Sequence, residues 1–424
     1  MTALVMVAVL VALFLLNVPI AWALGITSLA ALMAFTDVPL MVVPQRMFTG
    51  TDSFTLIAIP FFLLAGALME RSGISDKLVA LAQGVVGHIR GGLGGIAVGS
   101  SMLFAGVSGS GIAATAAIGR ITIPAMTRRG YEPSFATSIQ ASAGAMGIII
   151  PPSIVMILYS VITGASVSDL FLGGVIPGVL LAVALMVAGY VIAKRRNYAA
   201  EERMAIGSLG KTFLASIPAL LMPVIIIGGI LFGIVTPTES AALAAAYALV
   251  IGMLHRRLRF DQLPDILFEV ALTSSMIMLI VANASAFAWV VTAERLPQQL
   301  ASFLGSVSTA PLFILGVCVV MLLVAGMFLD TSAALIILIP VMVPVINAAG
   351  IDPVHFGVVA VVALAIGLAT PPVGLNLFVA AGIAKIDILQ AARGLAPFMA
   401  GMLLVLLLLI AVPEIVTWLP EALS

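Results

Sequence analysis

The chain has 424 residues, of which 62% are hydrophobic and 8% charged, and its formal net charge is zero. Soluble domains carry about 25% charged residues, so this composition excludes a water-soluble globular protein and predicts an all-α protein spanning a lipid bilayer many times. The single cysteine, Cys318, excludes a disulfide framework, and the three histidines lack zinc-ligand spacing. We also expect no nucleic-acid partner.

The first predicted element is an apolar span at residues 4–16. It lacks the basic flank and the cleavage site of a signal peptide, so we interpret it as a membrane span. A turn at Asn17, Val18 and Pro19 leads into a second span. The basic residues then concentrate in four places, which the positive-inside rule puts on the cytoplasmic face. These clusters are 71–90, 120–129, 194–211 and 256–259.

Between the first two basic clusters, residues 94–123 are apolar but interrupted by a glycine-rich stretch at 106–111. Both ends of this segment are cytoplasmic, so we predict a re-entrant hairpin. Residues 133–163 then cross outward with a break at Pro151 and Pro152, and 171–193 return.

The second half follows the same order with opposite orientation. After spans at 213–234 and 239–254, residues 266–292 cross outward. A hairpin at 311–346 therefore opens to the outside, a span at 354–383 is broken at Pro371 and Pro372, and 397–419 end the chain. We count ten spans and two hairpins with both termini periplasmic, and predict interfacial helices at 75–88 and 296–304. Thr236 and Glu239 have capping-box spacing, which predicts a helix start there.

Residues 106–152 repeat as residues 326–372 at a constant offset of 220. Inverted repeats with helices broken near the membrane midplane are typical of secondary transporters. The two copies share glycines and prolines at Gly106/Gly326, Pro124/Pro344, Gly130/Gly350, Pro133/Pro353, Gly147/Gly367, Pro151/Pro371 and Pro152/Pro372.

Each repeat predicts one sodium site, since hydroxyls and carbonyls freed by glycine and proline are the hard oxygen ligands that small cations prefer. The alternative for Asp330 is a helix cap on the amide of Ala333 or Ala334. The first predicted site comprises Ser108, Ser110, Pro151 and Ser153, and the second Gly326, Asp330, Thr331, Thr370 and Gly374.

Other polar residues on apolar spans line a pathway or join helices, and the second interpretation is the better supported one for any single residue. They are Gln140, Ser142, Asn283 and Asn376. Two rival classes stay open. Ser108 in a G-x-S-G sequence is compatible with an intramembrane serine protease, which needs a histidine beside the serine. A passive channel would not require matched broken helices.

Four motifs resemble the large membrane subunit of tripartite ATP-independent periplasmic (TRAP) transporters. They are F-A-G-V-S-G-S at 104–110, I-P-P-S at 150–153, L-D-T at 329–331 and A-T-P-P-V-G-L-N at 369–376. The resemblance implies a bacterial inner-membrane protein that is not an enzyme. It also implies sodium-driven uptake of an organic acid by an elevator mechanism, with at least two sodium ions. The implied partners are a periplasmic substrate-binding protein and a separate four-helix membrane subunit.

On this interpretation, substrate lies near Gly109, Ser110, Asp330 and Asn376, with its carboxylate at hairpin-helix N-termini and no mid-membrane Arg or Lys. The runner-up is a binding-protein-independent sodium/dicarboxylate symporter, although the Ser-Asn-Thr tripeptide usual in that class is missing. The expected division is scaffold with first arm at 1–92, transport domain at 93–163, scaffold with second arm at 164–307, transport domain at 308–384 and C-terminal scaffold helix at 385–424.

Overall fold

A computed structural model describes residues 2–35, 38–198, 200 and 203–423. This part of the chain is helical throughout, with no strand among the described residues. Seven helices are long and apolar enough to cross a membrane, or eight if the bent pair at the C-terminal end is one span. Each of the ten predicted spans corresponds to a helix or a broken helix, while the periplasmic placement of the termini, which concerns the undescribed Met1 and Ser424, stays a prediction.

The first repeat runs from the N-terminal helices to the long helix before the undescribed residues 201–202. Its elements are α1 (Thr2–Leu15), α2 (Ile20–Phe35), α3 (Val42–Thr51), η1 (Phe54–Ile57), α4 (Ala58–Arg71), α5 (Ile74–Val86), α6 (Gly92–Ser108), α7 (Gly111–Arg128), α8 (Pro133–Gly144), η2 (Ala145–Ile148), α9 (Ile154–Thr163) and α10 (Val167–Arg195).

The second repeat continues to the C-terminal end. Its elements are α11 (Ile206–Leu231), α12 (Pro237–Leu254), η3 (Phe260–Gln262), α13 (Leu263–Ala293), α14 (Leu296–Val307), α15 (Pro311–Phe328), α16 (Thr331–Ala348), α17 (Pro353–Ala369), α18 (Leu375–Ala384), α19 (Ile388–Ala392), α20 (Ala396–Ala411) and α21 (Glu414–Leu423).

The offset of 220 residues relates the elements of the two repeats. Helices α7 and α16 coincide at both ends, since 331 − 111 and 348 − 128 both equal 220. The double-proline peptides of both copies are cis. The copies differ at α13, which is continuous over 31 residues, whereas its counterpart is divided into α3, η1 and α4.

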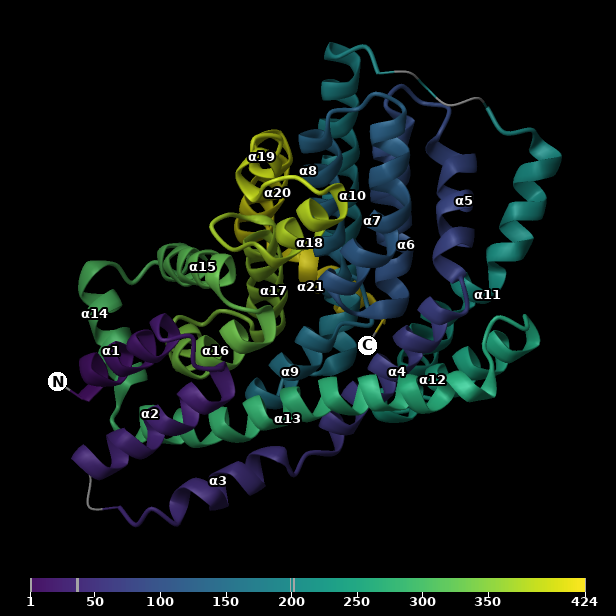
Figure 1. The fold of residues 1–424 in the computed structure, drawn as a ribbon. Helices are drawn as coiled ribbons and strands as arrows, with labels where there is room; N and C mark the ends of the chain where they lie inside the picture. Colours follow the sequence, from purple (N-terminus) through teal and green to yellow (C-terminus); the bar gives the residue numbers. More distant parts are fainter. Residues whose placement is uncertain (1, 36–37, 199, 201–202, 424) are drawn as a thin grey trace.

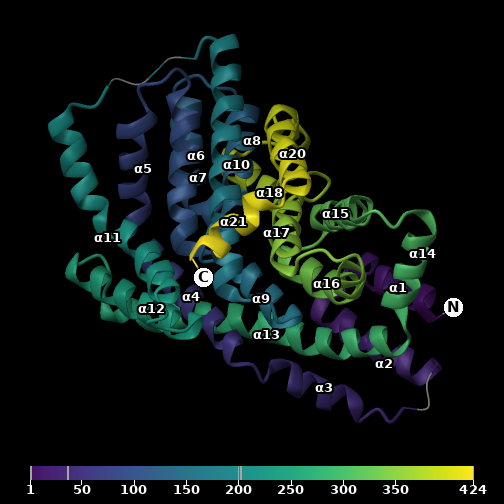
Figure 2. The ribbon, with the colours of Figure 1, turned by 180° about the vertical axis from the view of Figure 1, so that it is seen from behind.

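One group of helices packs around α13. Helices α2, α3 and α4 contact it, and α12 packs on α4. In Figure 1, α13 crosses the lower part of the molecule, whereas α6 and α7 stand upright, and Figure 2 shows the same arrangement from behind. A Cβ at Gly25 would lie 2.3 Å from Asn283 Oδ1, and one at Gly50 would lie 1.9 Å from Ser285 Oγ. Glycine therefore lets α2 and α3 approach α13 closely. At the start of α12, the predicted capping box of Thr236 and Glu239 is confirmed.

A second group contains both hairpins, and its packing is crossed between the repeats. Helix α9 of the first repeat packs on α16 of the second, and α18 of the second packs on α7 and α8 of the first. Gln140 on α8 accepts from Thr122 at 2.9 Å and donates to Ser101 at 3.1 Å, which joins α8 to both helices of the first hairpin, α6 and α7. The interpretation of Gln140 as an interhelical link is confirmed.

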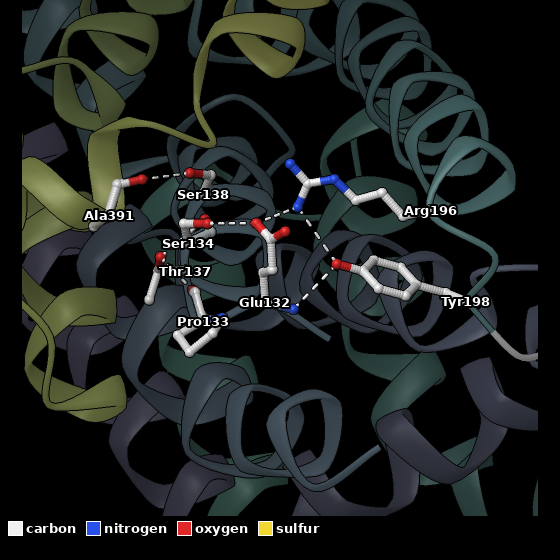
Figure 3. Close-up of polar contacts among 8 residues, drawn as sticks. All are labelled: Glu132, Pro133, Ser134, Thr137, Ser138, Arg196, Tyr198 and Ala391. Atoms are coloured by element: carbon white, nitrogen blue, oxygen red, sulfur yellow. Dashed lines mark hydrogen bonds and ion pairs between the residues drawn. The ribbon is translucent and has the colours of Figure 1, made fainter. Parts of the chain in front are cut away.

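Polar and aromatic contacts attach α10 and α20 to α8. Arg196, just after α10, forms an ion pair with Glu132, and the amide of Glu132 donates to the Tyr198 hydroxyl at 3.1 Å (Figure 3). Phe135 on α8 contacts both Tyr198, at 5.5 Å between ring centroids, and Phe398 on α20, at 5.7 Å. The hydrogen bond that the Arg196 guanidinium donates to the Tyr198 hydroxyl is the main reason that the pKa of Arg196 is raised. These contacts hold α8, α10 and α20 as one body.

Candidate functional site

The tip of the first hairpin lies directly against the first helix break. Gly109 has φ of +62°, and a Cβ there would lie 2.7 Å from the Pro152 carbonyl oxygen, so only glycine fits without strain. Ser110 begins α7 by accepting from the Ala113 amide, and Ser153 begins α9 by accepting from the Met156 amide. The structure therefore brings together Ser108, Ser110, Pro151 and Ser153, the first predicted sodium site.

The second break contacts its hairpin at a different point. The amides of Val373 and Gly374 both donate to the Met327 carbonyl at 3.3 Å, next to Gly326. A Cβ at Gly326 would lie 3.0 Å from the Leu364 carbonyl oxygen, so α15 and α17 pack backbone against backbone. Thr370 donates to the Ile366 carbonyl of its own helix at 2.6 Å. Gly326, Thr370 and Gly374 are thus close together on the α15 side of this hairpin.

Asp330 and Thr331 belong to the tip of the second hairpin. The Asp330 carboxylate accepts from the Ser332 amide at 3.0 Å, so it caps α16 as the alternative interpretation predicted, but on Ser332 and not on Ala333 or Ala334. The Thr331 hydroxyl is buried without a hydrogen-bond partner among the described residues. An unsatisfied buried hydroxyl is costly, so its oxygen is suited to a hard cation.

Asn376, predicted near substrate, lies behind the first tip. Its side chain is fully buried and donates to the Ala141 carbonyl of α8 at 3.3 Å, and its amide nitrogen is 3.3 Å from the position of a Cβ on Gly111. Asn376 therefore joins the second broken helix to the first hairpin, and its carbonyl oxygen has no partner within the described part of the chain.

A cavity of about 430 Å³ opens beside the first tip, between α4 and α13 on one wall and α6 and α7 on the other. Ser108 and Ser110 line it, and so do three charged residues, Glu70, Arg120 and Glu269. The Arg71 guanidinium lies 3.3 Å from the Glu269 carboxylate. We refer to this space as the inner cavity, because the positive-inside rule puts its basic residues on the cytoplasmic side.

A second cavity, of about 450 Å³, is related to the first by the repeat, and we refer to it as the outer cavity. Thr49, Gly50 and Ser53 line it where Glu269, Val270 and Thr273 line the inner one, each pair 220 residues apart. No charged side chain is among its lining residues in the described part of the chain, and it does not reach either hairpin tip.

Sequence reasoning missed the charged wall of the inner cavity. It grouped Arg120 with the basic loop at 120–129 and described the middle of the membrane as free of Arg and Lys, whereas Arg120 lies on α7 and faces the same cavity as Ser110. The signal was in the sequence, since Arg120 lies eight residues before the next basic residue, Arg128.

The catalytic arrangement of a serine protease is not formed around Ser108. The Ser108 hydroxyl donates to the Ser110 carbonyl, with 3.4 Å between the two oxygen atoms, and the buried His355 instead has its Nε2 at 2.8 Å from the Leu409 carbonyl. His355 is therefore not the hydrogen-bond partner of Ser108.

Comparison with known proteins assigns the family. Residues 7–415 match the model of the tripartite ATP-independent periplasmic transporter DctM component. The chain is 44% identical over 410 residues to the isethionate TRAP transporter permease protein DctMQ of Oleidesulfovibrio alaskensis, covering 95% of this chain and 64% of that relative's length.

Two relatives match over nearly their full lengths. The C4-dicarboxylate large permease DctM of Pseudomonas aeruginosa is 40% identical, with 94% of this chain and 93% of the relative covered. The sialic acid large permease SiaM of Vibrio cholerae is 38% identical, with coverage of 96% and 95%. Among solved structures, the YdaH transporter of Alcanivorax borkumensis has the same fold, with a TM-score of 0.62, 14% identity and 88% of each chain covered. The chain is therefore a DctM-type large membrane subunit of the TRAP transporter family.

Proposed function

We propose that this protein is the transport subunit of a sodium-coupled importer of an organic acid, working by an elevator mechanism in the bacterial inner membrane. The observation that carries this proposal is the crossed packing of α9 on α16 and of α18 on α7 and α8. It ties both hairpins and both broken helices into one body, which is what a unit that moves as a whole requires.

The proposed moving unit is larger than the transport domain expected from the sequence. Helices α10 and α20 pack on α6, α8 and α17. Arg196 and Tyr198 contact Glu132 just before α8 (Figure 3), and Phe135 on α8 contacts Tyr198 and Phe398. We therefore include both helices, which the sequence-based division put in the scaffold. The proposed scaffold is α1 to α4 with α11 to α13, and α5 and α14 are the arms because they contact both groups.

Sodium coupling rests on the oxygen atoms at the two breaks. At the first, Ser108, Ser110 and Ser153 offer hydroxyls beside the carbonyls of the double proline. At the second, the unsatisfied Thr331 hydroxyl and the Asp330 carboxylate lie on one tip, and Thr370 and Gly374 flank the break. We propose that each set binds one sodium ion.

The substrate class follows from the relatives and from the helix ends. The names of the relatives give isethionate, C4-dicarboxylates and sialic acid as their substrates, and all of these are organic acids. The first residues of α7 line the inner cavity beside Ser110, and a helix N-terminus favours a carboxylate or sulfonate. We propose a separate small membrane subunit and a periplasmic binding protein as partners.

Reconstitution into proteoliposomes tests this function. The protein, with the small subunit, is assayed for uptake of succinate, isethionate and sialic acid, with and without a sodium gradient and with and without the binding protein. We expect saturable uptake of one acid that needs both sodium and the binding protein. Uptake that needs sodium alone would favour a binding-protein-independent symporter, and uptake that needs neither would refute the proposal.

A further inference from the structure

Arg120 lies on the wall of the inner cavity, further along α7 than the hairpin tip. It follows Ser110 by ten residues on α7, which is about 15 Å along a helix axis. Side chains on a helix lean toward its N-terminus, which here is the tip, so the long Arg120 side chain shortens that gap. Its side chain is exposed to the cavity, which Ser108 and Ser110 line at the other end.

The scaffold wall presents a carboxylate to the same space as Arg120. Glu70 on α4 is partly buried and lines this cavity. The second acid of the wall, Glu269, already has the Arg71 guanidinium at 3.3 Å. Glu70 and Arg120 thus lie on opposite walls of the cavity, across the boundary with the proposed moving unit.

We propose that Arg120 is a substrate-binding residue that takes the second oxyanion, or a polar distal group, of an extended organic acid. The first carboxylate or sulfonate lies at the N-terminus of α7, and Glu70 faces Arg120 across the cavity. This inference rests on the proposed function and names the part of the site that selects substrates by length. An acid long enough to reach Arg120 must compete with Glu70 for the guanidinium.

The repeat strengthens this assignment. The residue equivalent to Arg120 is Pro340, which lines the outer cavity, and the residue equivalent to Glu70 is Val290. The repeated backbone therefore requires neither an arginine at position 120 nor a glutamate at position 70. The two cavities therefore differ in chemistry at this pair of equivalent positions.

Two substitutions with opposite expected effects test the proposal. Binding of succinate, isethionate and sialic acid to the purified complex is measured calorimetrically in sodium buffer for the wild type, Arg120→Gln, Arg120→Lys and Glu70→Gln. We expect Arg120→Gln to weaken binding of the acid that is taken up about tenfold, because it removes a charged hydrogen bond. Arg120→Lys should restore part of the loss, and Glu70→Gln should tighten binding about threefold, because it removes the competing carboxylate.

Arg195→Gln is the matched control, since Arg195 ends α10 and does not line the cavity. If Arg120→Gln and Glu70→Gln change binding in the same direction, the two residues form only a structural link and the proposal is wrong. It is also wrong if Arg120→Gln binds as tightly as the control. The proposed function fails by a different result, namely that the wild type takes up none of the three acids. Thermal unfolding of each variant identifies any variant that does not fold.

Discussion

The two hairpins have the same helix lengths to within a residue but different surroundings. The first tip is buried against its own helix break, with Gly109 beside the Pro152 carbonyl. The second break contacts the body of its hairpin at Met327 and leaves Val373 38% exposed. A duplicated backbone has therefore been preserved while the contacts at its two functional ends have diverged, so equivalent residues cannot be assumed to have equivalent roles.

Substitutions of the shared glycines Gly147 and Gly367 are expected to have the largest effect on stability, and they test the different contacts of the two breaks. A Cβ at Gly367 would lie 2.5 Å from the Gly326 carbonyl carbon, and one at Gly147 would lie 2.4 Å from the Ser110 carbonyl oxygen. Backbone cannot move aside as a side chain can, so we expect Gly367→Ala to lower the free energy of unfolding in detergent by about 2–3 kcal/mol. Gly147→Ala should cost a similar amount and distort the first tip as well.

The control for both variants is Gly382→Ala, since nothing lies within 4 Å of a Cβ at that position. Alanine should stabilise this helical site by up to about 1 kcal/mol. Equal stabilities for the Gly367 and Gly382 variants would contradict the backbone contact between α15 and α17.

Gln140 marks a further difference between the two repeats, because neither it nor its hydrogen-bond partners have polar equivalents in the second repeat. Residues 101, 122 and 140 are Ser, Thr and Gln, whereas the equivalents are Met321, Met342 and Ala360. Gln140→Leu leaves buried hydroxyl groups without their amide partner, so we expect a loss of about 2 kcal/mol in chemical unfolding. Thr292→Val, which removes only a hydroxyl bonded to its own helix, should have little effect. A comparable loss in both variants would argue against the interhelical link.

Substitutions of Ser110 and Asp330 at the two hairpin tips separate helix capping from ion binding. Ser110 and Asp330 both cap the following helix, so replacing either by Ala should destabilise it by about 1 kcal/mol, seen as faster hydrogen exchange in its first turn. Asp330→Asn retains a cap but loses the charge. If Asp330 binds sodium, this variant needs more sodium for half-maximal uptake, and an unchanged requirement would remove Asp330 from the second site.

The smallest effect is expected at the equivalent residues Glu132 and Asp352, each followed by a proline that starts a helix. Asp352 caps α17 through the His355 amide at 2.7 Å, whereas Glu132 pairs with the exposed Arg196. Exposed pairs contribute little and are screened by salt, so Glu132→Gln should cost about 0.5 kcal/mol and less at high ionic strength. Asp352→Ala should cost about 1 kcal/mol at any salt concentration, and a reversed order would refute these two roles.

The positions of the helices were predictable because proline, glycine and charge act locally. The breaks at Pro151 and Pro371, the two hairpins and the helix start at Thr236 all follow from backbone chemistry that the sequence displays. The interruption at Asp52 and Ser53, between α3 and η1, was not predicted, because no proline or glycine lies between Gly50 and Pro60.

The composition of the candidate site was less predictable, because it depends on which helices face each other. Nothing local shows that Glu70 on α4 and Arg120 on α7 share one cavity, or that α10 and α20 pack with the hairpins. The sequence predicted the Asp330 cap with an error of one residue in the bonded amide, Ser332 in place of Ala333. This was possible because a cap involves only the first turn of its own helix.

The exchange of short helices between the halves also bears on how this chain acquires its structure. Since α9 packs on α16, and α18 on α7 and α8, an isolated half would lack these contacts. Each half therefore completes its packing only together with the other. During synthesis, α9 can contact α16 only after the second half has entered the bilayer.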